Sequence, residues 1–320
     1  MTINSSIDAV NGAASSYPLP PPNASHESAR LNVQHALSLA DLDGELLLCP
    51  LLPPPNTNGI SDGTSKERKK VADVGSGTGV WVIDFATRYP WADVVGLDLT
   101  TPPAESLPPN ICFVVQDVEK PWLSLGQGSN TRVAEDDRFD LIHGRQILLN
   151  LRYPRKALKR NFENLKPGGM VEFREFWNPL VSETGTENVP LLVEWHQLTV
   201  DAAAAMGCDH GFASQLPRAM KEAGFVDVRV SDRRIPLGGW ALDGDRRQDE
   251  RTARMDALLT EMIRVGAQGM TKEMFVKALG WEVDQAAEYA ERVVRELERK
   301  DLKEDRIYAR FRIVCARKPL

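Results

Sequence analysis

Short apolar runs alternate with amphipathic segments through the middle of the chain, separated by turns rich in glycine, proline or charge. Strands are predicted for VADVG at 71–75, DVVGLDL at 93–99, ICFVVQ at 111–116, RFDLIHG at 138–144 and GMVEFREF at 169–176. Helices are predicted for VWVIDFATRY at 80–89 and PRKALKRNFENL at 154–165. This alternation predicts an α/β fold in which helices cover both faces of a parallel sheet.

The C-terminal half adds helices and two further strands. Helices are predicted around 187–206 and 214–224, and strands for FVDVRVSD at 225–232 and IYARFRIVCARK at 307–318. A mainly helical, charged stretch of about 236–305 separates these two strands. We therefore expect a helical insert that caps the sheet.

The N-terminal segment 1–30 has a different composition from the rest of the chain. It is rich in Ser, Asn, Ala and Pro and includes PLPPP at 18–22, so it has little apolar surface to bury and is expected to be mobile. Residues 31–320 are predicted to form one domain, in which the polar stretch 56–70 is a loop.

A glycine-rich motif, Asp73-Val-Gly75-Ser-Gly77-Thr-Gly79, connects the first predicted strand to the first helix after it. Glycines let the chain turn tightly and approach a ligand closely, and a helix N-terminus presents free N–H groups. The next strand ends at Asp98, whose carboxylate suits the two hydroxyls of a ribose. A glycine turn without a ligand is the alternative, but strand, turn, helix and distal acid together indicate a nucleotide site.

Two cofactors use such a frame. A dinucleotide motif, G-x-G-x-x-G, needs glycine at position 80, where this chain has Val80. The acid Asp73 would repel a pyrophosphate, whereas it suits the ammonium group of S-adenosylmethionine. The motif therefore favours S-adenosyl-L-methionine over NAD.

Asp117 and its neighbours extend the predicted cofactor site. Asp117 follows the third strand and is expected to accept the adenine amino group, with the N–H of Val118 as the second contact. Leu99 is expected to cover one face of the adenine. Taken alone, Asp117 is more often only a turn residue.

Composition and charge narrow the classes of function. Lys and Arg number 39 and Asp and Glu 45, which gives a net charge of −6 and argues against broad nucleic-acid binding. The chain has neither a run of 18 apolar residues nor a secretory signal, so we expect no membrane span. The chain has four scattered cysteines and no C-x-x-C pair; they are Cys49, Cys112, Cys208 and Cys315. This spacing predicts a reducing compartment and no metal site.

Several consecutive motifs resemble class I S-adenosylmethionine-dependent methyltransferases, and more narrowly the fungal LaeA-like branch associated with secondary metabolism. These motifs are DVGSGTGVWVIDFATRYPWADVVGLDL, NICFVVQDVEKPW, FDLIHGRQILLN and ENLKPGGMVEFREF. The likeness covers roughly Tyr17 to Pro319. It implies a Rossmann-like sheet of order 3-2-1-4-5-7-6 with strand 7 antiparallel, an N-terminal helical lid around Gln34 and His35, and a helical insert between strands 6 and 7.

The resemblance also implies roles for individual residues. Gly75, Gly77 and Gly79 would approach the methionine part of the cofactor, and Asp73 would serve its amino group. Asp98 would hold the ribose and Asp117 the adenine.

Methyl transfer mainly requires alignment of donor and acceptor, with a general base only where the acceptor must lose a proton early. His143, at the end of the fourth strand, is the first candidate for that base, because histidine titrates near neutral pH; it is also placed to contact the cofactor. His196 is the second candidate. Packing is the alternative for both, while His26 and His210 are expected at the surface or in structural roles.

Three functions remain open at this point. The first is methylation of an oxygen or nitrogen on a small-molecule secondary metabolite in a fungus. The second is a LaeA-type nuclear regulator that acts through protein partners, and the third is a methyltransferase fold with altered or lost chemistry. A cytoplasmic protein is expected in the first case and a nuclear one in the second.

Overall fold

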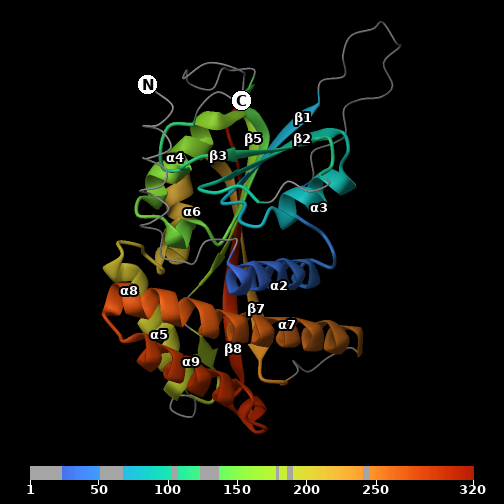
Figure 1. The fold of residues 1–320 in the computed structure, drawn as a ribbon. Coiled ribbons are helices and arrows are strands. Elements are labelled where there is room, and N and C mark those ends of the chain that lie inside the picture. The colour runs from blue at the N-terminus through green and yellow to red at the C-terminus, as the bar shows by residue number, and fades with distance from the viewer. Residues whose placement is uncertain are drawn as a thin grey trace, which may run out of the picture.

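A central sheet carries the fold, with helices on both of its faces and a helical layer beyond one end (Figure 1). The computed structural model describes residues 24–50, 68–102, 107–122, 137–177, 180–185, 190–240 and 246–320.

The sheet has the order β3-β2-β1-β4-β5-β8-β6, and β7 pairs with β8. Its strands are β1 (Lys69–Val74), β2 (Ala92–Asp98), β3 (Ile111–Val115), β4 (Phe139–Arg145), β5 (Leu165–Phe176), β6 (Val181–Ser182), β7 (Val226–Leu237) and β8 (Ile307–Arg317). Strands β1 to β5 run parallel, and β8 is antiparallel to β5 and β7. The predicted topology is confirmed, since the sixth and seventh predicted strands are β7 and β8; the two-residue β6 was not predicted.

The helices divide between the faces of the sheet and its end. They are α2 (Ser25–Asp41), α3 (Val80–Arg88), α4 (Pro154–Asn164), α5 (Pro190–Ala205), α6 (Phe212–Glu222), α7 (Arg246–Met270), α8 (Val276–Leu279) and α9 (Val283–Leu297). Helices α4 and α6 pack on one face and α3 on the other (Figure 1). Adjacent residues of β1 therefore enter different cores, with Val71 on the α3 side and Ala72 on the α4 side.

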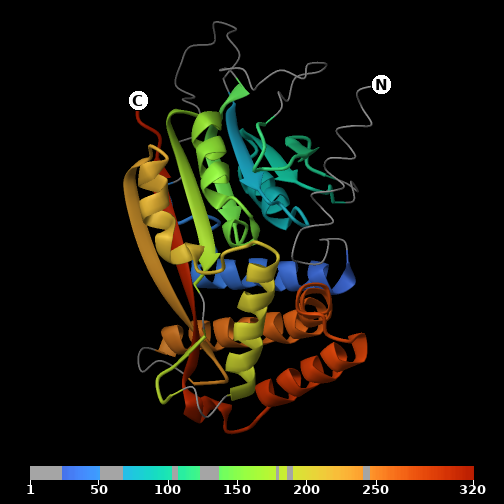
Figure 2. The same cartoon turned by 90° about the vertical axis from the view of Figure 1, so that its left-hand side faces the viewer.

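The predicted helical insert lies between β7 and β8 and consists of α7, a π-helical turn at Thr271–Phe275, α8, α9 and a 3-10 turn at Leu302–Asp305. With α5 it forms a cap beyond the carboxyl ends of the parallel strands (Figure 2). Helix α2 lies between the sheet and this cap and packs against α7 (Figure 2). The ends of β7 and β8 reach into the cap, so cap and sheet share one apolar core.

Two expectations concern segments that are only partly described. Helix α2 begins at Ser25, so it includes the last residues of the segment 1–30 that was predicted to be mobile. Residues 1–23 and the part of the predicted loop before residue 68 lie outside the described residues. Among the described helices, none combines the length and hydropathy that crossing a lipid bilayer requires.

Candidate functional site

The glycine-rich motif forms the turn from β1 into α3, at the carboxyl edge of the sheet. Gly75 and Gly79 have φ of +71° and +74°, which only glycine adopts readily. A Cβ atom on Gly79 would lie 2.5 Å from Cζ of Phe113, and one on Gly75 would lie 2.7 Å from Cδ1 of Ile147. Both the backbone conformation and the lack of space therefore require glycine at these two positions.

Asp98 ends β2 directly beside this turn. Its Oδ2 accepts a hydrogen bond from the N–H of Gly77 at 2.9 Å, and its Oδ1 accepts one from the N–H of Thr100 at 3.2 Å. Burial raises the pKa of the Asp98 carboxyl, against the lowering effect of these backbone donors. The structure thus fixes the orientation of Asp98 and joins the ends of β1 and β2 through it.

Asp73 pairs with His143 across the centre of the sheet. The two residues are register partners on β1 and β4, and Oδ1 of Asp73 lies 2.8 Å from Nδ1 of His143. The imidazole of His143 stacks on the indole of Trp81, with ring centroids 4.0 Å apart and planes 3° from parallel. His143 is only 3% exposed. Asp73 contacts the edge of its ring and Trp81 covers one face of it.

Asp117 forms a turn after β3. Its Oδ1 accepts a hydrogen bond from the N–H of Glu119 at 3.0 Å, and its Oδ2 pairs with Lys120 at 3.2 Å. Val118 is buried and Leu99 is half-buried. Asp117 therefore stabilises a turn. Contacts of Asp117, Val118 and Leu99 with adenine stay a prediction.

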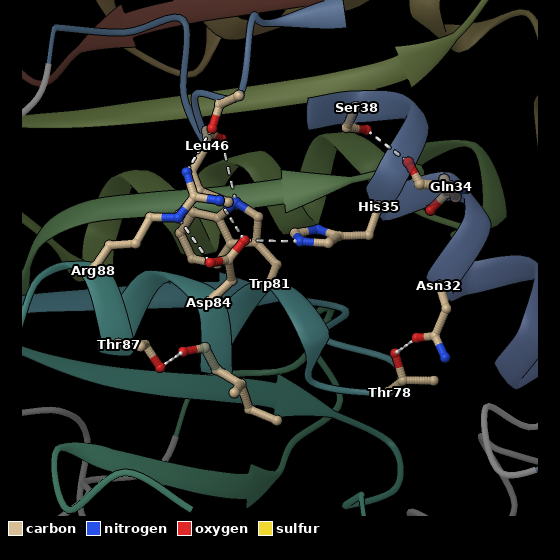
Figure 3. Close-up of polar contacts among 12 residues, drawn as sticks. Asn32, Gln34, His35, Ser38, Leu46, Thr78, Trp81, Asp84, Thr87 and Arg88 are labelled. Atoms are coloured by element: carbon tan, nitrogen blue, oxygen red, sulfur yellow. Dashed lines mark hydrogen bonds and ion pairs between the residues drawn. The ribbon is translucent and has the colours of Figure 1, made fainter. Parts of the chain in front are cut away.

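Helix α2 lies over the glycine turn and is tied to it by polar contacts (Figure 3). Nε2 of His35 lies 3.1 Å from Oδ2 of Asp84 on α3, and its Nδ1 accepts a hydrogen bond from Arg145 at 3.2 Å. Burial, and next the charge of Arg145, lower the pKa of His35 to about 4. His35 is therefore a neutral bridge at pH 7 that joins α2 to α3 and β4.

Two buried polar atoms without hydrogen-bond partners show whether the site fits S-adenosylmethionine. Nε2 of Gln34 and Oγ of Ser76 are buried and have no hydrogen-bond partner among the described residues. Gln34 is on α2 and Ser76 is in the glycine turn, the two elements that face each other here. Buried polar groups without partners are costly, and the carboxylate and hydroxyls of this cofactor offer such partners. The donor set therefore fits the cofactor.

A cavity of about 90 Å³ lies between the sheet edge and the cap. Its lining residues come from α2, the segment after β4, the end of β5, α5, the loop before α6, and α7; they are Arg30, Gln146, Leu149, Asn150, Phe176, Trp195, His196, Thr199, His210, Met262, Ile263, Gly266 and Met270. The lining is mainly apolar, with a few convergent polar groups, as in typical small-molecule sites.

Two histidines face this cavity together. His196 on α5 stacks on Phe176, with ring centroids 5.4 Å apart. Burial lowers the pKa of His196 to about 3 and that of His210 to about 4, so both are neutral at pH 7. Nε2 of His210 is buried without a hydrogen-bond partner among the described residues. His210 is only 7% exposed, so of the two expected placements, surface or structural, the surface position is wrong.

The structure separates the two candidate bases that the sequence suggested. His196 lines the cavity, whereas His143 is not among the described lining residues and lies under the glycine turn with Asp73. The sequence analysis missed the role of His210 in the cavity, because only the tertiary fold brings the loop before α6 against α5. A signal in the sequence was the presence of two histidines in the predicted acceptor-side region.

Comparisons with known proteins agree with this arrangement. A family model described as a methyltransferase domain matches residues 53–230. The chain is 28% identical to methyltransferase pytC of Aspergillus terreus, over 96% of this chain and 84% of that protein. It is 27% identical to the secondary metabolism regulator LAE1 of Cochliobolus heterostrophus, over 81% of this chain and 76% of that protein.

A solved structure was also found, that of phosphoethanolamine N-methyltransferase 2 of Haemonchus contortus with S-adenosylhomocysteine. Its TM-score is 0.44 and its identity 18%, over 81% of this chain and 50% of that one. The glycine turn, the sheet order and the family match define an S-adenosylmethionine-dependent methyltransferase fold. The chain belongs to the methyltransferase family, and its relatives include fungal proteins of secondary metabolism.

Proposed function

We propose that this protein transfers a methyl group from S-adenosylmethionine to a small, uncharged and mainly apolar acceptor. The observation that carries the proposal is the cavity under the cap, which adjoins the carboxyl ends of β4 and β5. Ligands of open α/β sheets bind at this edge, so donor and acceptor would meet there.

The cofactor would lie between the glycine turn and α2. Gly75, Gly77 and Gly79 would leave room for its methionine part, and Asp73 would serve its amino group. Asp98 would hold the ribose. When bound, the cofactor supplies a methyl group already activated by a sulfonium, so the protein's tasks are alignment and exclusion of water.

The polar groups of the cavity support a neutral acceptor. Arg30, a cation in the lining, is ion-paired with Glu27 at 2.6 Å. The remaining lining side chains are apolar, neutral amides, a threonine, or the two histidines that burial keeps neutral. A hydroxyl or amine of the acceptor would donate a hydrogen bond to such an imidazole. Because their low pKa values make them weak bases, His196 or His210 would take the proton only as transfer of the methyl group makes that proton strongly acidic.

His143 suits a positioning role better than that of the base. Its Nδ1 already contacts Asp73, and its ring is stacked on Trp81. We infer that it orients the Asp73 carboxylate toward the amino group of the cofactor.

Regulation through a protein partner is the second candidate function, and the similarity to LAE1 motivates it. In that case the acceptor would be a protein, or methyl transfer would be absent, and a nuclear location is expected. The mainly apolar lining of the cavity favours the enzyme, because such linings are typical of small-molecule sites.

Incubation with methyl-labelled S-adenosylmethionine and a fungal cell extract tests the proposal. Label in small molecules of the extract supports it, and label confined to proteins supports the second candidate. If no label is transferred while calorimetry shows intact cofactor binding, the proposed activity is wrong. Asp98→Ala serves as the control that weakens cofactor binding.

A further inference from the structure

Two of the four cysteines meet at a buried glutamate, away from the glycine turn. Glu172 on β5 and Cys315 on β8 are register partners in an antiparallel pair, so their side chains lie on the same face of the sheet. Cys49 comes from the segment that follows α2. The two Sγ atoms and a carboxylate oxygen of Glu172 all lie within 4.8 Å of one another, and all three residues are buried.

We propose that Cys49, Glu172 and Cys315 bind a Zn²⁺ ion. Zinc takes thiolate ligands at about 2.3 Å and carboxylate ligands at about 2.0–2.2 Å, so tetrahedral ligand atoms lie roughly 3.5–3.8 Å apart. Sγ of Cys315 is 3.3 Å from Oε2 of Glu172, close to that separation. The three ligand atoms lie within 4.8 Å of one another, so they would have to move closer together by side-chain rotation.

The ligand types favour zinc over other ions. Two sulfur ligands disfavour Mg²⁺ and Ca²⁺, which prefer oxygen, and the carboxylate disfavours purely thiolate-bound Cu(I). Zinc binds cysteine as the thiolate, so its binding would release the two thiol protons to solvent.

The groups around the three ligands are suited to hold them in place. Oε2 of Glu172 accepts hydrogen bonds from the N–H groups of Leu48 and Cys49, at 2.9 and 2.7 Å. Such contacts orient a carboxylate ligand and spread its charge. Two thiolates, one carboxylate and Zn²⁺ sum to a charge of −1, and the buried cation Arg174 interacts favourably with Glu172.

A cavity beside Cys315 offers a path by which the ion would enter. This separate cavity, of about 430 Å³, is lined by Cys315 and Met170, together with Arg229 and Arg317. Because this cavity adjoins Cys315, we expect a water molecule from it to serve as the fourth ligand. Three protein ligands with one open position allow the metal to exchange.

Zinc at this position would strengthen the attachment of the lid. The segment that contains Cys49 follows α2, and the last residue of α2, Asp41, pairs with Arg174 at 2.8 Å. Arg174 lies two positions after Glu172 on β5. A metal ion would thus fasten the segment after α2 to β5 and β8, and bound zinc should raise the unfolding temperature.

The full chain is incubated with ZnCl₂, and gel filtration removes the unbound metal. The zinc that remains with the protein is then measured by mass spectrometry. We expect about one Zn²⁺ per chain in the wild type and in the matched control Cys112→Ser, whose thiol is exposed. Cys49→Ser, Cys315→Ser and Glu172→Gln should each weaken binding roughly 10-fold or more. Circular dichroism checks that each variant is folded.

A measurement on the wild type keeps the proposal falsifiable if those variants do not fold. Co²⁺ bound by two thiolates gives a sulfur-to-cobalt charge-transfer absorption, and added Zn²⁺ should remove it. Absence of that absorption overturns the proposal, as does equal zinc retention by Cys49→Ser and the wild type. A Cys49–Cys315 disulfide as the only reaction of the pair would also overturn it.

Discussion

Replacing Asp98 tests the cofactor site most directly. Its carboxylate accepts two backbone hydrogen bonds, from Gly77 and Thr100, and would still have lone pairs for the two ribose hydroxyls. In Asp98→Ala, at least one charge-assisted bond to the ribose is lost. Such a bond contributes about 1.5–3 kcal/mol, so the Kd of S-adenosylmethionine should rise about 10- to 100-fold.

Asp98→Asn gives a graded version of the same test. The amide keeps the size of the side chain and one acceptor oxygen but loses the charge. We expect a smaller increase in Kd, about 3- to 10-fold, because neutral hydrogen bonds are weaker than charged ones. Isothermal titration calorimetry with S-adenosylmethionine and S-adenosylhomocysteine measures both effects.

A matched control separates binding from stability. Asp93 lies at the other end of β2, and its carboxylate pairs with Arg68 at 2.6 Å near the surface. Asp93→Asn should leave the Kd unchanged, and thermal unfolding reports any loss of stability in each variant. Unchanged affinity in folded Asp98→Ala would refute the assignment of Asp98 to the ribose.

Three further predictions concern the acceptor, the lid and a buried acid. His196→Ala should lower turnover roughly 100-fold in the labelling assay if His196 is the base. His35→Ala removes the bridge between Asp84 and Arg145, so it should weaken cofactor binding in calorimetry and expose α2 to proteolysis. Burial raises the pKa of Glu175 to about 8, from an ordinary value of 4.5. Stability should therefore fall as pH rises from 4.5 to 8, and Glu175→Gln should remove that loss in urea unfolding.

Each of these has an outcome that contradicts it. A near-normal rate in His196→Ala would reduce His196 to packing and direct attention to His210. Unaltered affinity and proteolysis in His35→Ala would mean that apolar contacts alone hold the lid. The sign for Glu175 follows from proton binding: the folded state holds the proton more tightly than the unfolded chain, so deprotonation favours unfolding. A pH profile that is the same in wild type and Glu175→Gln would show that Glu175 is not responsible.

The architecture could be predicted from local patterns. Buried strands between amphipathic helices predicted the parallel strands, and the motif from Asp73 to Gly79 predicted a cofactor turn at their carboxyl edge. These features depend on short stretches of chain, where the hydrophobic period and the need for glycine act within a few residues. The position of Asp98 beside the glycine turn could be predicted as well, because the carboxyl ends of adjacent parallel strands lie at the same edge of a sheet.

Contacts between distant segments required the tertiary structure. Cys49 and Cys315 show no ligand spacing, yet the pairing of β5 with β8 and the path of the chain after α2 bring them to Glu172. In the same way, His210 joins His196 only because the cap folds over the sheet. The hydrophobic periodicity of a short segment does not determine such long-range contacts. They follow from how the layers of the fold pack and from which buried polar groups must find partners.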